Sequence, residues 1–240
     1  MPSLWLIIPA WGRYEVTQIA FPQLADCCDT LTAVHGIDAH AVVIGNDENL
    51  AYARQHGFDT IEQTNQPLAR KWNDGYQHAA EHGADFFVPC GTDDWLDPAY
   101  LAQLPEGRQI RATRWATSIR EDGRKLLQFF VDYEGGDGIR IIPRVLLEGC
   151  RFRPADDYRE RAIDTSVWRT MKRTAPGFSF VYSTAPLNVV QFQSVEPQLN
   201  AYQALKTRFR HEELDAPFDV LRSRYPAEFV SAAEEMYRAR

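Results

Sequence analysis

The sequence predicts an α/β fold: a mixed, mostly parallel central sheet flanked by helices, with further helices at the C-terminus. Through the first hundred residues, short apolar runs alternate with segments of helical periodicity. This alternation is typical of parallel sheets with right-handed crossovers. The composition is that of an ordinary globular protein, with 45% hydrophobic and 25% charged residues. A chain of 240 residues is long enough to form a sizeable core.

The first half of the chain is expected to alternate strands with helices. Uncharged apolar runs mark the strands, and the segment that begins at Asp59 is the weakest of them. Val16, Ile19 and Leu24 have helical spacing, and Gly83 follows a predicted helix as a C-terminal cap. The expected strands are 4–10, 39–45, 59–64 and 85–91, and the expected helices are 14–29, 50–56 and 67–82.

Beyond residue 98 the alternation changes. Segments 108–120 and 125–133 are expected to be strands on either side of a turn with the sequence EDGR, and a helix is expected near 159–173. Segments 178–184 and 187–193 could be further strands. Amphipathic helices around 199–209 and 229–237 are expected to close the chain. We therefore expect a domain over 1–195, divided near residue 100, and a helical extension over 196–240.

Charge and cysteine content limit the classes of function. The chain has 33 acidic and 26 basic residues, a net charge of −7, which argues against broad nucleic-acid binding. Cys27, Cys28, Cys90 and Cys150 fit no metal motif, and the first two are poor disulfide partners because they are adjacent. Reduced thiols favour a cytoplasmic location. No signal peptide is expected, and no segment approaches the roughly 20 apolar residues of a membrane span.

Three carboxylates cluster where the strand expected at 85–91 ends, in the stretch GTDDWLDP. In an open parallel sheet, ligands bind beyond the carboxyl ends of the strands. Neighbouring carboxylates repel one another unless a cation balances them, and Asp oxygens suit Mg²⁺ or Mn²⁺ shared with substrate phosphates. We therefore expect Asp93 to ligate a metal ion. Asp97, which precedes Pro98, is expected to cap a helix instead.

Two further loops are expected beside this acidic stretch. The first, PAWGRYE, follows the strand expected at 4–10, and the second, NQPLARKWNDG, leads into the helix expected at 67–82. They bring Arg13, Arg70 and Lys71 to the same edge of the sheet. A cation at this edge could bind a diphosphate, although any one of these side chains could also be a solvated surface charge.

Four segments, taken in order, resemble the GT-A-type nucleotide-sugar glycosyltransferases of the family-2 kind. The family opens with a strand that ends in a pattern like IPTYNR, and this chain has IIPAWGR. The family then has N-x-G-x-x-x-A-R-N-x-G and D-x-D-D-x-x-x-P, and this chain has NQPLARKWNDG and GTDDWLDP. The family's later helix begins E-D-x-x-x-W, and this chain has IDTSVW at 163–168. The resemblance extends over about residues 4–170.

The resemblance implies a metal-dependent glycosyltransferase of the hexosyltransferase type, with Mn²⁺ or Mg²⁺ as cofactor. It implies a UDP- or GDP-linked sugar as donor, bound by residues 1–100, and a hydroxyl of a glycan or protein as acceptor, bound by 101–195. Asp164 would be the general base that deprotonates this hydroxyl in an inverting reaction. The residues implied at the donor site are Pro9, Ala10, Trp11, Arg13, Asp47, Lys71, Thr92 and Asp93, the last as metal ligand.

The chain departs from the family's pattern at three points. Gly91 stands where the family has the first Asp of its D-x-D. GNDEN replaces the family's base-reading acidic pair after the second strand, with Asp47 out of register. No histidine follows the last strands, where many relatives have a third metal ligand, so Gln191, Gln193 or water could take that place.

Several alternatives stay open at this point. Asp164 could be a helix N-terminal residue, and the pair Asp156 and Asp157 could belong to a solvated loop. Trp95 could stack on a ligand or belong to the core, and the glycine-rich segment 133–140 could line a pocket or be a plain turn. A sugar nucleotidyltransferase is disfavoured because PAWGRYE has a single glycine. A catalytically degenerate nucleotide-sugar-binding module is the other alternative.

Overall fold

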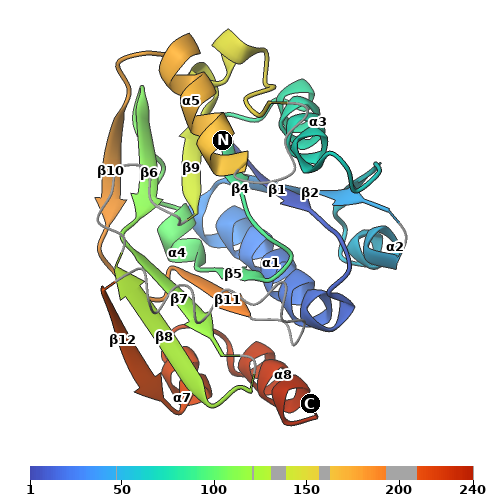
Figure 1. The fold of residues 1–240 in the computed structure, drawn as a ribbon, viewed down its shortest axis with the longest axis vertical. Helices are drawn as coiled ribbons and strands as arrows, with labels where there is room; N and C mark the ends of the chain where they lie inside the picture. Colours follow the sequence, from blue (N-terminus) through green and yellow to red (C-terminus); the bar gives the residue numbers. More distant parts are fainter. Residues whose placement is uncertain (47, 121, 131–138, 157–162, 193–209, 240) are drawn as a thin grey trace.

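The computed structural model describes the chain except residues 47, 121, 131–138, 157–162, 193–209 and 240, and for residues 163–165 it describes the backbone alone (Figure 1). The described chain contains a seven-stranded sheet, with the order β10-β6-β9-β4-β1-β2-β3, and a five-stranded sheet, with the order β12-β8-β7-β11-β5. The N-terminus lies in the upper part of the molecule in Figure 1, and the C-terminus lies near the lower end beside α8.

The centre of the larger sheet is parallel. β1 pairs in parallel with β2 and β4, and β2 pairs in parallel with β3. β9 is antiparallel to both of its neighbours, β4 and β6, and β10 pairs in parallel with β6. The strands are β1 (Ser3–Pro9), β2 (Asp38–Gly45), β3 (Asp59–Glu62), β4 (Phe86–Pro89), β6 (Gln109–Thr113), β9 (Arg140–Pro143) and β10 (Ser179–Ser183).

Helices cover both faces of β1, which is why its sequence is an apolar run without alternation. The even-numbered residues from Leu4 to Ile8 share a buried cluster with α1 (Tyr14–His35). Trp5 and Ile7 point to the other face and share a second cluster with α3 (Leu68–Glu81). Successive side chains of a strand point to opposite faces, so a strand between two helix layers must be apolar at every position.

The smaller sheet packs against the far side of α1. Val16 and Ile19 of α1 share a third cluster with Trp95, Val190 and the C-terminal helices. Figure 1 shows α1, in blue, between the larger sheet and the strands of the smaller one. The elements are β5 (Asp94–Leu96), β7 (Trp115–Ile119), β8 (Lys125–Phe130), β11 (Val189–Phe192), β12 (Arg210–Asp215), α7 (Pro217–Arg222) and α8 (Ala227–Arg238).

Short elements complete the described chain. α2 (Glu48–Gln55) connects β2 to β3, and α4 (Pro98–Leu101) follows β5. Two 3-10 turns, Arg144–Leu146 and Glu148–Cys150, follow β9, and α5 (Ile163–Thr174) precedes β10.

From β1 to β4 the fold agrees with the sequence-based prediction, element by element, but the rest of the chain differs. The single strand expected at 108–120 is two strands, because β6 pairs with β9 and β10 in the larger sheet whereas β7 pairs with β8 and β11 in the smaller one. Arg114 lies between them, and its N–H donates to the carbonyl of Ser183. The elements β5, β12 and α7 were not expected. The helix expected at 199–209 lies outside the described residues.

The expectations on cysteines and membrane spans can also be compared with the structure. All four cysteines are free, and Cys27, Cys28 and Cys90 are buried. Burial raises the pKa of the Cys28 thiol to about 12. Within the described residues, no helix combines the length and the apolar character that crossing a membrane would need.

Gly75 ends the stretch NQPLARKWNDG and lets α3 approach the sheet closely. A Cβ at this position would lie 2.5 Å from Cγ2 of Ile7 and 2.7 Å from Cδ1 of Ile44. Helix propensity alone would make Gly75→Ala stabilising by about 1 kcal/mol. We expect the opposite sign, a loss of about 1–3 kcal/mol in the free energy of unfolding, because the buried face is overpacked.

Urea denaturation of the wild type and Gly75→Ala would measure this difference. Gln77→Ala is the matched control, since Gln77 is exposed on the same helix, and it should change stability by less than about 0.5 kcal/mol. A Gly75→Ala variant as stable as the wild type would contradict the close packing of α3 on β1 and β2.

Candidate active site

Three loops meet at the carboxyl edge of the larger sheet. Residues 10–13 connect β1 to α1, residues 63–67 lead from β3 to α3, and residues 90–93 lead from β4 to β5. β1, β3 and β4 run in the same direction. Their following loops therefore lie at one edge, where ligands of open parallel sheets bind. The sequence-based expectation that these loops are neighbours is thus correct.

Arg13 and Asp93 form an ion pair across this edge. Nη1 of Arg13 lies 2.5 Å from Oδ2 of Asp93, and the two side chains are 20% and 17% exposed. Arg13 has a left-handed backbone, with φ of 57°, and it follows Gly12, with φ of 58°. A non-glycine residue in this region typically costs about 1–3 kcal/mol, and such strain is common at functional sites.

The same residue begins α1. The carbonyl of Arg13 accepts hydrogen bonds from the N–H groups of Val16 (3.0 Å) and Thr17 (2.9 Å). The hydroxyl of Thr17 donates to that carbonyl as well, at 3.0 Å. The turn that starts the helix therefore contains the arginine that pairs with Asp93.

Asp94 is a buried carboxylate next to this ion pair, and the sequence did not assign it a role. Its Oδ2 accepts the N–H of Gly91 at 2.6 Å, and its Oδ1 is buried with no hydrogen-bond partner among the described residues. Burial, and then the charge of Asp93, raise the pKa of Asp94 from its ordinary value of 3.8 to about 7, although the N–H of Gly91, the side chain of Gln191 and the charge of Arg13 oppose the shift. The strand β5 places it there, because Asp94 pairs with Gln191 of β11.

A side chain at position 91 would meet the two carboxylates. A Cβ on Gly91 would lie 2.5 Å from Oδ1 of Asp93 and 3.2 Å from Oδ2 of Asp94. The two carboxylates therefore occupy the space that a side chain at residue 91 would need. A metal site at this edge would use Asp93 and Asp94 together, instead of a first Asp two residues before Asp93.

A cavity of about 190 Å³ opens beside the two carboxylates. Asp93, Asp94 and Gln191 line it together with Arg140 of β9 and Trp72 of α3. Two carboxylates and an amide oxygen are hard ligands of the kind that Mg²⁺ and Mn²⁺ prefer. The partnerless buried Oδ1 of Asp94 is the observation that fits a cation here, because an orphaned buried acceptor is costly without a partner.

Lys71 lies at this edge of the sheet, but its ammonium is enclosed. Nζ donates to the carbonyl of Ala10 at 2.5 Å and to Oδ1 of Asn65, and the residue is 0% exposed. It therefore connects the loop after β1 to the loop before α3. Lys71 does not line the cavity, whereas Arg140 does.

The other residues of the expected donor site lie around this edge with differing exposure. Trp11 is 61% exposed, whereas Ala10 and Thr92 are buried. Pro9 is half-buried at the end of β1. Asp47 lies outside the described residues, as do Gln193 and most of the segment 133–140.

Two asparagines after β2 were missed by sequence reasoning. The amide of Asn49 donates to the carbonyl of Gly12 at 3.2 Å. Both Asn49 and Asn46 have a buried Oδ1 with no hydrogen-bond partner among the described residues. Both asparagines belong to the stretch GNDEN, in which only the acidic residues were considered as possible contacts of a base. Amide groups both donate and accept, which is what reading a base edge requires.

Asp97 and Trp95 have structural roles. Asp97 caps α4, because its side chain accepts the N–H of Ala99, and it pairs with Arg224 of the C-terminal segment. The helix-cap interpretation is thus confirmed. Trp95 is 0% exposed and its ring donates to the carbonyl of Ile19 at 3.0 Å. It belongs to the core, and the stacking interpretation was wrong.

Asp164, the general base that the resemblance implies, is the second residue of α5, and its side chain lies outside the described atoms. Asp156 lies near the start of this helix, since its N–H donates to Oγ of Ser166 at 2.7 Å; Asp157 lies outside the described residues. A larger cavity, about 580 Å³, lies between α5 and residues 149–156. Asp93 and Asp94 do not line this larger cavity. Because both carboxylates line the smaller one, the smaller cavity is the candidate metal site.

Comparison with known proteins supports the fold. No protein-family model matches the chain, and no curated protein is significantly similar to it. Among solved structures, it is similar to the mannosyltransferase PcManGT of Pyrobaculum calidifontis in complex with GDP-Man and Mn²⁺, with a TM-score of 0.51 and 12% identity over 98% of this chain and 70% of that chain.

Two further solved structures are similar at lower scores. A Drosophila β-1,4-galactosyltransferase 7 mutant, in complex with manganese, UDP-Gal and xylobiose, has a TM-score of 0.48 and 14% identity over 85% of this chain and 74% of that chain. A CMP-2-keto-3-deoxy-manno-octonic acid synthetase complexed with CTP has a TM-score of 0.42 and 12% identity over 77% of this chain and 91% of that chain. The fold is therefore GT-A-like, a mixed α/β arrangement with a mostly parallel central sheet, as the sequence predicted.

The buried carboxyl of Asp94 predicts how stability depends on pH without metal. Its pKa is higher in the folded protein than in the unfolded chain, so the folded protein keeps a proton that the unfolded chain releases. The free energy of unfolding should therefore fall as pH rises from about 4 to about 7, by at most about 1.4 kcal/mol for each pH unit. Asp94→Asn removes this pH dependence. The stability of the variant relative to the wild type should therefore rise between pH 5 and pH 8.

Urea unfolding in the presence of a chelator, at pH 5 and at pH 8, would measure this change. Asp219→Asn is the control, because Asp219 has a side chain that is 76% exposed and lies on α7. If Asp94→Asn and the wild type keep the same difference in stability at both pH values, the carboxyl of Asp94 is not protonated on folding.

Proposed function

We propose that the protein is a metal-dependent glycosyltransferase that moves a sugar from a nucleotide-diphosphate donor to a hydroxyl acceptor. The observation that carries this proposal is the pair Asp93 and Asp94, which face one cavity at the carboxyl edge of a GT-A-like sheet. Arg13 and Arg140 stand beside them. Acidic groups that hold a cation, next to guanidinium groups that can bind phosphate oxygens, are what recognition of a diphosphate requires.

Asp93 and Asp94 would hold the divalent cation, Mn²⁺ or Mg²⁺, with the amide oxygen of Gln191 as a further ligand. When bound, the cation would neutralise the diphosphate and stabilise it as a leaving group. Arg13 neutralises Asp93 in the structure described here. It would turn to the diphosphate once a cation takes over the charge of Asp93, and it would then bind the phosphate oxygens directly.

The exposed ring of Trp11 and the backbone of residues 9–10 and 92 would complete the donor site. Trp11 is 61% exposed and lies in the loop that also carries Arg13. An exposed aromatic ring there is suited to stacking on a base or a sugar. The amides of Asn46 and Asn49, with Asp47 between them in sequence, would contact the base. UDP- and GDP-linked hexoses are the donors to test first, and PcManGT, which has GDP-Man bound, supports including the second.

Asp164 would act as the general base for the acceptor hydroxyl of a glycan or protein, with inversion at the anomeric carbon. α5 begins at Ile163, so Asp164 lies in its first turn, where the helix dipole favours the ionised carboxylate. We further propose that residues 1–195 form the catalytic domain, that the remainder is an extension, and that the enzyme is cytoplasmic, which its four free cysteines support.

The products distinguish this proposal from its alternatives. Incubation with UDP- and GDP-linked hexoses and Mn²⁺ should release a nucleoside diphosphate. A nucleotidyltransferase would instead convert a nucleoside triphosphate and a sugar or sugar phosphate with release of pyrophosphate. A binding module would bind nucleotide sugars and release neither product.

Replacing Asp93 should remove the metal dependence of donor binding. Without Asp93, the site keeps one carboxylate beside an unpaired Arg13, so that the affinity for a cation falls and the Mn²⁺-dependent part of nucleotide binding is lost. We expect Asp93→Ala to weaken binding of UDP or GDP in the presence of Mn²⁺ by at least about tenfold. Calorimetry with and without Mn²⁺ is the measurement.

Asp219→Ala is the matched control for this variant, since Asp219 is also an aspartate in an ion pair with arginine but lies far from the cavity on α7. Thermal unfolding of both variants would show whether the fold is intact. Equal Mn²⁺ dependence in Asp93→Ala and the wild type would remove Asp93 from the metal site.

Replacing Asp164 should separate binding from transfer. Asp164→Asn keeps the size of the side chain but cannot accept a proton. It should retain donor binding and lower the rate of transfer by roughly 10²–10⁴-fold, the range typical for loss of a general base. Single-turnover rates with a hydroxyl acceptor, beside calorimetry with the donor, would measure both effects. A normal rate would make Asp164 a helix N-terminal residue only, and a loss of donor binding would move the base to Asp156 or Asp157.

A further inference from the structure

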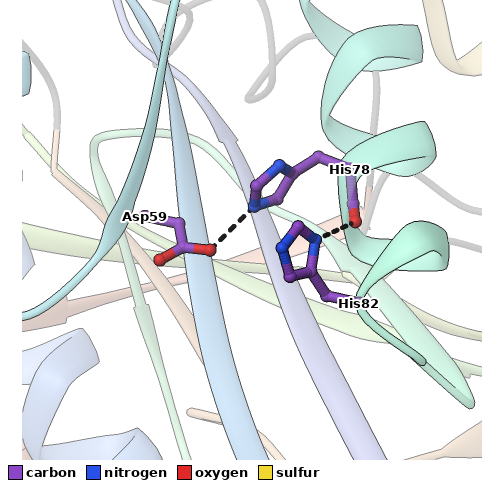
Figure 2. Close-up of side chains that lie close together, drawn as sticks. All are labelled: Asp59, His78 and His82. Atoms are coloured by element: carbon purple, nitrogen blue, oxygen red, sulfur yellow. Dashed lines mark hydrogen bonds and ion pairs between the residues drawn. The ribbon is translucent and has the colours of Figure 1, made fainter.

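Two histidines and an aspartate converge at the amino edge of the larger sheet, opposite the candidate active site. His78 lies on the last turn of α3, His82 is the C-terminal cap of this helix, and Asp59 is the first residue of β3. One ligand atom from each of the three lies within 4.8 Å of the other two. Figure 2 shows the three side chains directed toward a common space between α3 and the strand.

The local structure explains why these residues meet. His78 and His82 are four positions apart, so they share one face of the helix, the spacing that zinc-binding helices use. Successive residues of β3 point to opposite faces, and Asp59 therefore lies on the same face as Ile61, which packs with the cluster of α3. α3 runs antiparallel to the strands, which brings its C-terminal end to the amino edge.

We propose that His78, His82 and Asp59 bind a divalent cation of the zinc type. Imidazole nitrogens and a carboxylate oxygen are the usual ligands of Zn²⁺, and three protein ligands with one open position form a known type of site. Manganese and magnesium, which prefer oxygen ligands, would favour Asp93 and Asp94 instead. The two sites therefore differ in their ligands as well as in their edge of the sheet.

Hydrogen bonds already orient both imidazoles. Nδ1 of His82 lies 2.8 Å from the carbonyl of His78. A carbonyl can only accept, so Nδ1 carries the proton and Nε2 keeps its lone pair for a metal ion. In Figure 2, this second ring nitrogen is on the side of His82 that faces Asp59.

The pair of His78 and Asp59 needs only a small rearrangement. Nε2 of His78 lies 2.7 Å from Oδ2 of Asp59. Two ligand atoms at about 2.0–2.1 Å from a tetrahedral zinc ion are about 3.3 Å apart, so the pair must separate by a fraction of an ångström. His78 must also lose the proton at Nε2 or carry it at Nδ1. The side chains are 22% and 48% exposed, so this movement meets little packing.

A nearby tryptophan and a third histidine complete the surroundings. The ring of Trp5 lies 5.5 Å from that of His78 and 5.7 Å from that of His82, between centroids. His40 stacks on the same ring at 4.8 Å, but it pairs with Asp38 at 3.0 Å and is not one of the three clustered ligands. His40 is therefore a matched control, with the same ring neighbour and a similar contact with an aspartate.

Calorimetric titration of untagged, chelator-treated full-length protein with ZnCl₂ tests the proposal. The wild type and the Asp93→Ala variant should both bind one Zn²⁺ at this site. His78→Gln, His82→Gln and Asp59→Asn should each weaken that binding by about tenfold or more, whereas His40→Gln should not. The visible absorption of Co²⁺ in the same variants reports directly on imidazole ligands.

The unfolding temperature of each variant without metal is measured first, because a loss of zinc binding is informative only if the variant is as well folded as the wild type. Zn²⁺ should then raise the unfolding temperature of the wild type and of His40→Gln, but not that of His82→Gln. Equal zinc affinity in the wild type and in the His78→Gln and His82→Gln variants would overturn the proposal. An absence of zinc binding in the wild type would overturn it too, and the pair of Asp59 and His78 would then be an ordinary hydrogen bond.

Discussion

β1 is buried on both faces and bonded on both edges, and most features of the site follow from this constraint. Its neighbours β2 and β4 run parallel to it, and α1 and α3 cover its two faces. The register of β1 with β2 and β4 fixes where β1 ends relative to these two strands. The loop that carries Arg13 must therefore emerge beside the loop that carries Asp93. The ion pair between them is 80 residues apart in sequence but is fixed by strand register.

The same constraint explains what the sequence could predict. Apolar runs without alternation marked β1, β2 and β4 correctly, because a strand between helix layers has no polar face. Those strands also placed the loops of Arg13, Lys71 and Asp93 at one edge. The direction of each side chain was not predictable: Lys71 is enclosed by Ala10 and Asn65.

The second half was harder to predict for a physical reason. β6 and β7 are joined at Arg114 but belong to different sheets, and their sequence reads as one strand because each half has the same apolar alternation. The sequence of that segment does not show that its two halves pair with different strands, which come from residues 179–183 and 189–192. The short β5 was missed for a similar reason, since its three residues are mostly acidic and aromatic and only pairing with β11 makes them a strand.

That pairing decides the chemistry of the site. Asp94 points inward beside Gln191 because β5 pairs with β11, and burial then raises the pKa of its carboxyl to about 7. An inward carboxylate with a partnerless oxygen destabilises the protein without a ligand, so the position is costly for a purely structural role. Gly91 has no side chain to displace the two carboxylates, and its N–H donates to Oδ2 of Asp94. Under the proposed function, Asp93 and Asp94 would hold the cation together, in place of the two separated acids of the D-x-D pattern that the sequence resembles.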